Sequence, residues 1–410
     1  MLNPALWREQ RWLALWAAMF GFMLDAMDVM LYTFAIQALK TEFGLSNTEA
    51  GLASSATLVV SSIGGIIAGL LCDRIGRKRT LIYTVLLYSF ASAGTALSSG
   101  LWSLMFWRAL VGLGLGGEWS AGAVLVAETW PAAQRGRAIA LMQSGWAIGY
   151  MLAAALAAVI LPTYGWRALF AAGLAPALLT FFIRAKVEEP KIWNAQEGAK
   201  SSLGDLFKGG LGRRTMLATT LATAVLFGYW GLFTWLAGFL SAPAAQGGAG
   251  FSIVKTSGFL IAVQAGAFCG YLTFGWISDR IGRRPAFSGF VATAAVLSAI
   301  YGTAPSWAGE NAGIALLVLG PLVGFFGTGF FSLFGSMLAE LYPTRIRGTG
   351  QGFAYNCGRG LSALAPWMVG ALADSHGLGA ALGLNAIFFL AGAIIVFTLP
   401  ETRGTDLEKL

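Results

Sequence analysis

Twelve long apolar stretches run through this chain of 410 residues, and a polar signature that follows the second stretch returns after the eighth. The signature is Asp73-Arg74-Ile75-Gly76-Arg77-Lys78, and its repeat is Asp279-Arg280-Ile281-Gly282-Arg283-Arg284. About 20 apolar residues in a helix cross a bilayer core. The pattern therefore predicts an all-α membrane protein with twelve transmembrane helices in two pseudo-symmetric six-helix bundles.

The expected membrane helices follow the apolar runs directly. They cover residues 12–37, 50–71, 80–98, 101–126, 138–160, 165–185, 214–240, 254–277, 285–304, 312–338, 348–373 and 376–399. We expect an N-terminal bundle at 1–185 and a C-terminal bundle at 214–410. The segment 186–213, rich in Lys, Glu, Gly and Ser, is the expected cytoplasmic linker between them.

Composition excludes an ordinary soluble protein. Hydrophobic residues make up 57% of the chain and charged residues 11%, whereas soluble domains carry about 25% charged residues. The three cysteines, Cys72, Cys269 and Cys357, form no CxxC pair and no ligand cluster. We therefore expect no disulfide, no metal and no cofactor, and the lipid bilayer is the expected surrounding.

The basic residues set the expected orientation. Placing the amino terminus in the cytoplasm puts most of the 27 Lys and Arg residues on the cytoplasmic side, as the positive-inside rule requires. Both termini are then cytoplasmic. The net charge of +8 follows from this topology, so nucleic acid is not an expected partner.

A second motif repeats at its own fixed offset. Glu128-Thr129-Trp130-Pro131 follows the fourth run, and Glu340-Leu341-Tyr342-Pro343 follows the tenth, at an offset of 340 − 128 = 212. Acidic and basic groups in such loops can pair across the cytoplasmic face. We interpret them as a gating latch, although the cations alone also serve to fix topology. The expected latch residues are Asp73, Gly76, Arg77, Glu128, Asp279, Arg283 and Glu340.

These motifs resemble a known family across the whole chain. The Asp-Arg-Ile-Gly-Arg-Lys loop, the Gly-rich stretch Arg108–Glu118 and the closing Leu399-Pro400-Glu401-Thr402-Arg403-Gly404 look like the major facilitator superfamily. Gly117-Glu118-Trp119 and Gly165-Trp166-Arg167 resemble the sialate and lactate:proton symporters, and Leu24-Asp25-Ala26-Met27-Asp28 is shared with aromatic-acid and nicotinate carriers. The resemblance implies a multi-pass protein of the bacterial inner membrane, which we expect to work as a monomer.

Charged residues inside the membrane point to the coupling site. Each costs about 2.5–3.5 kcal/mol at a helix centre on insertion scales, so Asp25, Asp28, Arg108 and Glu118 need partners or a wet cavity. The lone histidine, His376, lies near the outer end of the last helix, so a carboxylate must carry any proton. We expect Asp28 to pair with Arg108 and to take up a proton when they separate. A static pair, or coupling through Asp25 or Glu118, remains open.

Arg359 is the expected substrate clamp. It falls about halfway along the eleventh run, and no acidic residue lies at comparable depth in the second half. Its planar guanidinium matches a carboxylate bidentately. Tyr355 and Asn356 precede it, although one of them must point away. The alternative is an arginine that hydrogen-bonds backbone carbonyls.

Other polar candidates lie around this clamp: Tyr229, Gln264, Gln143 and Trp146. Each is equally compatible with ordinary interhelical packing. Taken together, the residues predict a secondary transporter that imports a small organic anion with protons. An aromatic-acid, nicotinate or sugar-acid carrier is the alternative, and a nontransporting membrane sensor is a more distant one. No P-loop and no catalytic Ser-His-Asp set appears, so an ATP-driven pump or an enzyme is not expected.

Overall fold

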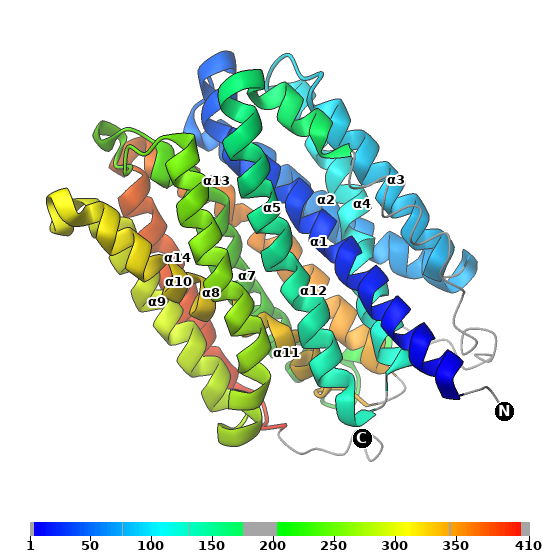
Figure 1. The fold of residues 1–410 in the computed structure, drawn as a ribbon. Helices are drawn as coiled ribbons and strands as arrows, with labels where there is room; N and C mark the ends of the chain where they lie inside the picture. Colours follow the sequence, from blue (N-terminus) through cyan, green and yellow to red (C-terminus); the bar gives the residue numbers. More distant parts are fainter. Residues whose placement is uncertain (1–3, 76, 131, 175–202, 344–345, 403–410) are drawn as a thin grey trace.

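Long apolar helices account for nearly all of the described chain (Figure 1). The computed structural model describes residues 4–75, 77–130, 132–174, 203–343 and 346–402. The first half contains α1 (Pro4–Phe43), α2 (Asn47–Ile75), α3 (Arg77–Thr95), α4 (Leu101–Thr129) and α5 (Ala132–Ala172). The second half contains α7 (Leu211–Ser241), α8 (Ile253–Ile281), α9 (Arg283–Ala308), α10 (Ala312–Thr328), α11 (Phe331–Ala339), α12 (Arg347–Ser362), α13 (Leu364–His376) and α14 (Leu378–Ile395).

Three of the expected helices differ in detail from the prediction. The sixth begins at a break inside α5, where Gly165 has a φ of 73°, and most of its expected length lies outside the described residues. The tenth is divided into α10 and α11 beside Gly329. The eleventh is divided into α12 and α13 at Ala363, because Pro366 has no N–H to donate to Ser362 and its ring clashes with that carbonyl.

The surface of the bundle is apolar. Among the described residues, seven helical spans are long and apolar enough to cross a membrane. Large hydrophobic side chains such as Phe90, Trp102 and Tyr164 are at least 70% exposed. Such a surface is unfavourable in water and suits lipid. The chain is therefore a membrane-spanning helical protein.

Glycines bring helix backbones into direct contact within each half. A Cβ on Gly112 of α4 would lie 2.2 Å from the carbonyl oxygen of Thr57 in α2. A Cβ on Gly324 of α10 would lie 1.8 Å from the carbonyl oxygen of Val263 in α8. The offset between the two glycines is 324 − 112 = 212, as for the two glutamate motifs. The offset between the two carbonyls is 263 − 57 = 206, as for Asp73 and Asp279. The sequence repeat is thus a repeat of one packing contact, and the Gly-rich stretch serves close helix packing.

The two halves meet along pairs of long helices. In Figure 1, α5 runs beside α8, and α2 also packs against α12 and α13. Helix α1 begins, and the described chain ends, at the lower end of the view, which we call the termini end. Helix α1 ends and α2 begins at the opposite end, which we call the far end. The centre of the molecule is therefore lined by helices from both halves.

The backbone contact between α2 and α4 gives the first prediction. In Gly116→Ala, the new Cβ would lie 2.0 Å from the carbonyl oxygen of Ser61, so the two backbones must separate. We expect a destabilisation of about 1–3 kcal/mol, seen as a melting temperature several degrees lower in detergent. Gly289→Ala in α9 is the control, because its Cβ would meet nothing within 4 Å. Equal melting of the two variants would show that the contact is not tight.

Candidate functional site

Two buried aspartates lie on α1, as the sequence predicts. Asp25 is 2% exposed and Asp28 is 1% exposed. Oδ1 of Asp28 accepts a hydrogen bond from the hydroxyl of Ser92 in α3. Oδ2 of Asp28 has no hydrogen-bond partner among the described residues. One oxygen of this carboxylate is therefore held in place and the other is available.

Arg108 of α4 is buried near these acids, with 1% of its surface exposed. Its guanidinium lies over the ring of Tyr32, 4.8 Å from the centroid. Asp28 and Arg108 interact electrostatically, but no ion pair within 4 Å joins them in the part of the chain that the structure describes. The expected pair is thus present as two neighbouring charges rather than as a salt bridge.

Arg359 of α12 is 8% exposed and lies against its own helix. Its Nη2 donates to the hydroxyl of Tyr355 at 3.4 Å, and its guanidinium is 4.9 Å from the centre of that ring. No carboxylate within 4 Å pairs with Arg359 in the described residues, and Nε has no hydrogen-bond partner there. Asn356 turns away: its side-chain oxygen faces Gly65 of α2, and its Nδ2 donates to Gly352 at 3.0 Å. Of the two flanking candidates, only Tyr355 stays with the arginine.

Tyr229 of α7 connects the two halves. Its hydroxyl accepts a hydrogen bond of 2.5 Å from Nε1 of Trp146 in α5. Its ring lies 5.3 Å from that of Phe331, and Phe331 is connected through Phe334 to the ring of Tyr355, with centroids 5.9 Å and 6.4 Å apart. Tyr271 is an electrostatic neighbour of Tyr229. The structure therefore brings the candidates Trp146, Tyr229, Tyr355 and Arg359 into one connected group, which we call the central aromatic cluster. Tyr271 belongs to this cluster and was missed, because nothing in its local sequence marks it.

Two glutamines complete the list of polar candidates. Nε2 of Gln143 donates to the carbonyl oxygen of Phe331 at 3.3 Å, so this residue also links the two halves. Gln264 is 1% exposed, and neither its amide nitrogen nor its amide oxygen has a partner among the described residues. Gln264 and Tyr271 are seven residues apart and so share a face of α8. A buried amide without partners is costly, and Gln264 stays a predicted substrate-binding residue.

Several expected site residues cannot be placed. The side chains of Asp73, Arg77, Glu118 and Glu128 lie outside the described part of the structure, as does the whole of Gly76. Their backbones, apart from that of Gly76, belong to α2, α3 and α4. The latch of the first half therefore stays a prediction.

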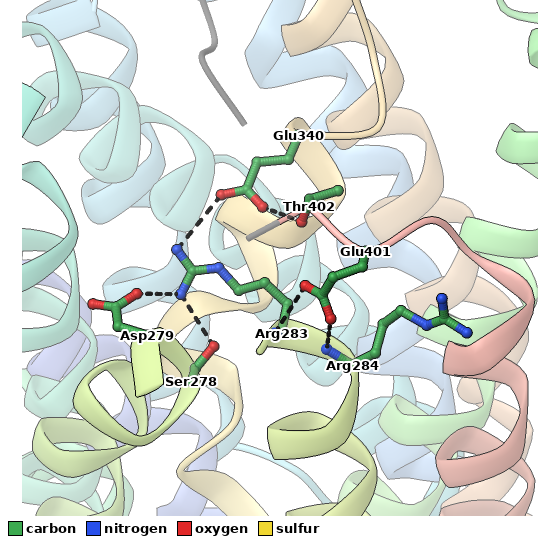
Figure 2. Close-up of polar contacts among 7 residues, drawn as sticks. All are labelled: Ser278, Asp279, Arg283, Arg284, Glu340, Glu401 and Thr402. Carbon is green, nitrogen blue, oxygen red and sulfur yellow. Dashed lines mark hydrogen bonds and ion pairs between the residues drawn. The ribbon is translucent and has the colours of Figure 1, made fainter. Parts of the chain in front are cut away.

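The latch residues of the second half lie together (Figure 2). Nη1 of Arg283 donates to Asp279 at 2.8 Å, and Nη2 lies 3.8 Å from Oε1 of Glu340. Glu340 also accepts a hydrogen bond from Thr402. Burial raises the pKa of Glu340 above its usual value, although Thr402 and Arg283 oppose this rise. The contacts of this cluster join elements of the second half to one another.

Glu401, in the segment after α14, also belongs to this cluster. Its two carboxylate oxygens accept hydrogen bonds from the backbone nitrogens of Arg283 at 2.9 Å and Arg284 at 3.1 Å (Figure 2). These nitrogens belong to the first turn of α9, where a negative charge is stabilised by the helix dipole. The cluster therefore fixes α8, α9, the end of α11 and the segment after α14 relative to one another.

At the far end, an aspartate that we did not single out from the sequence bridges the two halves. Asp374 of α13 accepts hydrogen bonds from the backbone nitrogens of Asn47 at 3.0 Å and Thr48 at 2.9 Å, and from the Thr48 hydroxyl at 2.6 Å. Desolvation would raise the pKa of Asp374, but these bonds outweigh it and lower the pKa. Two turns further along α2, Ser55 accepts a hydrogen bond from the backbone nitrogen of Trp367 at 3.3 Å. The far end is therefore closed.

Comparison with known proteins decides the family. The profile described as "Major Facilitator Superfamily" matches residues 18–273. The chain belongs to the major facilitator superfamily. A second profile, "Sugar (and other) transporter", matches residues 252–410. The chain is accordingly a membrane transporter and not an enzyme.

Relatives of known name agree with this assignment. A "Probable 4-methylmuconolactone transporter" of Cupriavidus pinatubonensis is 34% identical over 96% of this chain and 92% of its own length. The niacin transporter of Acinetobacter baylyi is 29% identical over 97% of this chain and 95% of its own length. A structure of the proton:xylose symporter XylE superposes with a TM-score of 0.76 at 20% identity, covering 98% of each chain. The last likeness supports the twelve-helix fold alone.

The bridge at the far end gives the second prediction. Asp374→Asn removes the negative charge that strengthens three hydrogen bonds across the two halves. We expect the population to shift toward conformations open at the far end. In a background without native cysteines, Ser55→Cys should then react faster with a membrane-impermeant maleimide. Glu310→Gln, an exposed change in the turn before α10, is the control. An unchanged labelling rate in Asp374→Asn would contradict the bridge.

Proposed function

We propose that this transporter imports a small organic carboxylate together with protons by alternating access. The observation that carries this proposal is Arg359, a buried cation with no carboxylate within 4 Å among the described residues. A charge at such a depth needs a counter-ion, and a guanidinium binds a carboxylate with two parallel hydrogen bonds. The transported anion supplies that partner.

The surroundings of Arg359 favour a flat acid. Tyr355 lies under the guanidinium, and Tyr229 is next in the central aromatic cluster. Tyr229 in turn stacks on Phe233, with ring centroids 4.7 Å apart, and meets Phe331 edge-on at 5.3 Å. Aromatic faces bind planar rings well. Since one relative carries niacin in its name, nicotinate is our first candidate, ahead of lactate-like or sialate-like acids.

Asp28 is the proposed coupling carboxylate. It is buried, one of its oxygens is free of hydrogen bonds among the described residues, and Arg108 is its electrostatic neighbour. The charge of Arg108 stabilises the ionised carboxylate, and loss of that charge in a dry site favours the protonated form. A change in the distance between these two groups during alternating access would therefore couple proton uptake to transport.

Orientation completes the proposal. With the termini end in the cytoplasm, most basic residues flank the membrane on the inner side. The far end then faces outward, so the closed bridge at Asp374 describes a state that is shut to the outside. We place the protein in the inner membrane of a bacterium.

The clamp gives the third prediction. Arg359→Ala should abolish nicotinate binding to the purified protein, and Arg359→Lys should weaken it nearly as much, because lysine keeps the charge but loses the planar fork. Isothermal titration would measure affinity, and thermal melting would show that both variants fold. Wild-type affinity in Arg359→Ala would exclude this residue as the clamp.

Coupling gives the fourth prediction. Asp28→Asn imitates a permanently protonated carboxyl, so liposomes containing it should fail to accumulate nicotinate under an inward proton gradient. Exchange of labelled for unlabelled substrate should persist, because it needs no net proton movement. If the variant still concentrates substrate, coupling belongs to Asp25 or Glu118.

A further inference from the structure

A small cavity lies between the two halves, next to the central aromatic cluster. Its volume is about 10 Å³, which is roughly the space that one water molecule or one carboxylate oxygen needs. Arg108 of α4 and Trp230 of α7 line it from opposite halves, and the remaining lining residues are Val29, Tyr32, Thr33, Ser54, Thr57, Leu58 and Thr234. We call it the Arg108–Trp230 cavity.

Both named residues bring hydrogen-bond donors that nothing in the described structure satisfies. Arg108 is 1% exposed, and its Nε and Nη1 atoms have no hydrogen-bond partner among the described residues. Trp230 is 8% exposed, and its Nε1 is likewise without a partner there. An unsatisfied buried donor costs about 1–3 kcal/mol, and more when it is charged. Three such atoms on two residues that line one cavity indicate a site for an acceptor.

The hydroxyl groups around the cavity do not fill that role in the described structure. The hydroxyl of Thr33 is bonded to the carbonyl oxygen of Met30, and the hydroxyl of Thr57 to the carbonyl oxygen of Ala53. The hydroxyl of Tyr32 donates to the carbonyl oxygen of Ala50 at 2.8 Å. Each of these three hydroxyls has thus given its proton to a backbone carbonyl. The unsatisfied donors are the nitrogens of Arg108 and Trp230, two of which belong to the cationic guanidinium, and the matching ligand atom is an anionic oxygen.

Trp230 separates this cavity from the proposed clamp. Its ring meets Tyr229 edge-on, with centroids 5.2 Å apart, and Trp146 edge-on at 6.0 Å. The aromatic pair Tyr229 and Trp230 thus has the Arg108–Trp230 cavity beside one ring and the group around Arg359 beside the other.

We propose that Arg108 and Trp230 form a second binding point for a carboxylate oxygen of the transported acid. This inference rests on the proposed function, since it takes the substrate to be a carboxylate. An anion held there touches both halves at once, so binding and closure of the bundle favour each other. The cavity matches one carboxylate oxygen in size, so it would hold that atom and not the whole acid.

The same geometry makes the substrate a competitor of Asp28. Asp28 is bonded to Ser92 of α3 and feels the charge of Arg108, while Tyr32 lies on the ring face of that guanidinium. A carboxylate at Nε and Nη1 of Arg108 supplies the negative charge that Asp28 otherwise supplies. The substrate anion therefore replaces Asp28 as the counter-ion of Arg108.

The test is equilibrium binding of nicotinate, lactate and N-acetylneuraminate to the purified full-length protein by isothermal titration. Trp230→Phe keeps an aromatic ring and removes one donor to a charged oxygen, so affinity should fall at least about tenfold. Trp102→Phe makes the same chemical change at a 79% exposed position and should leave affinity unchanged. Thermal melting establishes that both variants are folded.

Asp28→Asn supplies an independent arm. It removes the charge that competes for Arg108, so affinity for the same acid should rise several-fold. If the wild-type protein binds none of the three acids, the proposed function falls. If it binds one of them and Trp230→Phe binds equally tightly, or Asp28→Asn binds no more tightly, the second binding point is overturned while the proposed function stands.

Discussion

A charge buried among membrane helices must be stabilised by something, and this requirement organises the centre of the protein. In the first half, Asp28 and Arg108 interact electrostatically, but no ion pair within 4 Å joins them among the described residues. In the second half, Arg359 has only the hydroxyl and ring of its own helix neighbour, Tyr355, among described partners. Both arrangements leave cationic capacity unused. A transporter of anions needs a cation with free hydrogen-bond donors. An arginine whose donors are all bonded to protein groups would have to break those bonds before it could bind a substrate anion.

Much of the architecture follows from sequence because it rests on repetition. The offset of 206 in α2 and α8, and of 212 in α4 and α10, recurs in three dimensions as the contacts of Gly112 with Thr57 and of Gly324 with Val263. Helix packing of this kind is local and needs only small residues at fixed spacing, so it can be predicted. The isolation of Arg359 was predictable for a similar reason, since acidic residues at its depth are absent from the sequence of the second half.

Contacts between the halves were beyond the reach of sequence reasoning. Asp374 lies 326 residues from Thr48, and no local pattern links them. The sequence does contain two features that match this contact: a helix that starts at Asn47, whose first backbone nitrogens need acceptors, and an acid near the end of another helix. Both features are too common in proteins to predict that these two segments meet. Trp230 is one of 15 tryptophans in the sequence, and only the structure places it across the same cavity as Arg108. The hydrogen bond from Ser92 to Asp28 could likewise not be predicted, because it depends on how α3 packs against α1.

The bridge at Asp374 has a mechanical consequence. Asp374 is hydrogen-bonded to the first residues of α2. This helix has 29 residues and is about 43 Å long at 1.5 Å per residue. Because glycines fasten this helix to α4 backbone to backbone, it turns as a stiff rod and takes its neighbour with it. A tilt of a few degrees at the gripped tip becomes a displacement of several ångströms at the opposite tip. The hydrogen bonds of Asp374 on one side of the membrane are therefore coupled, through the length of α2, to the position of this helix on the other side.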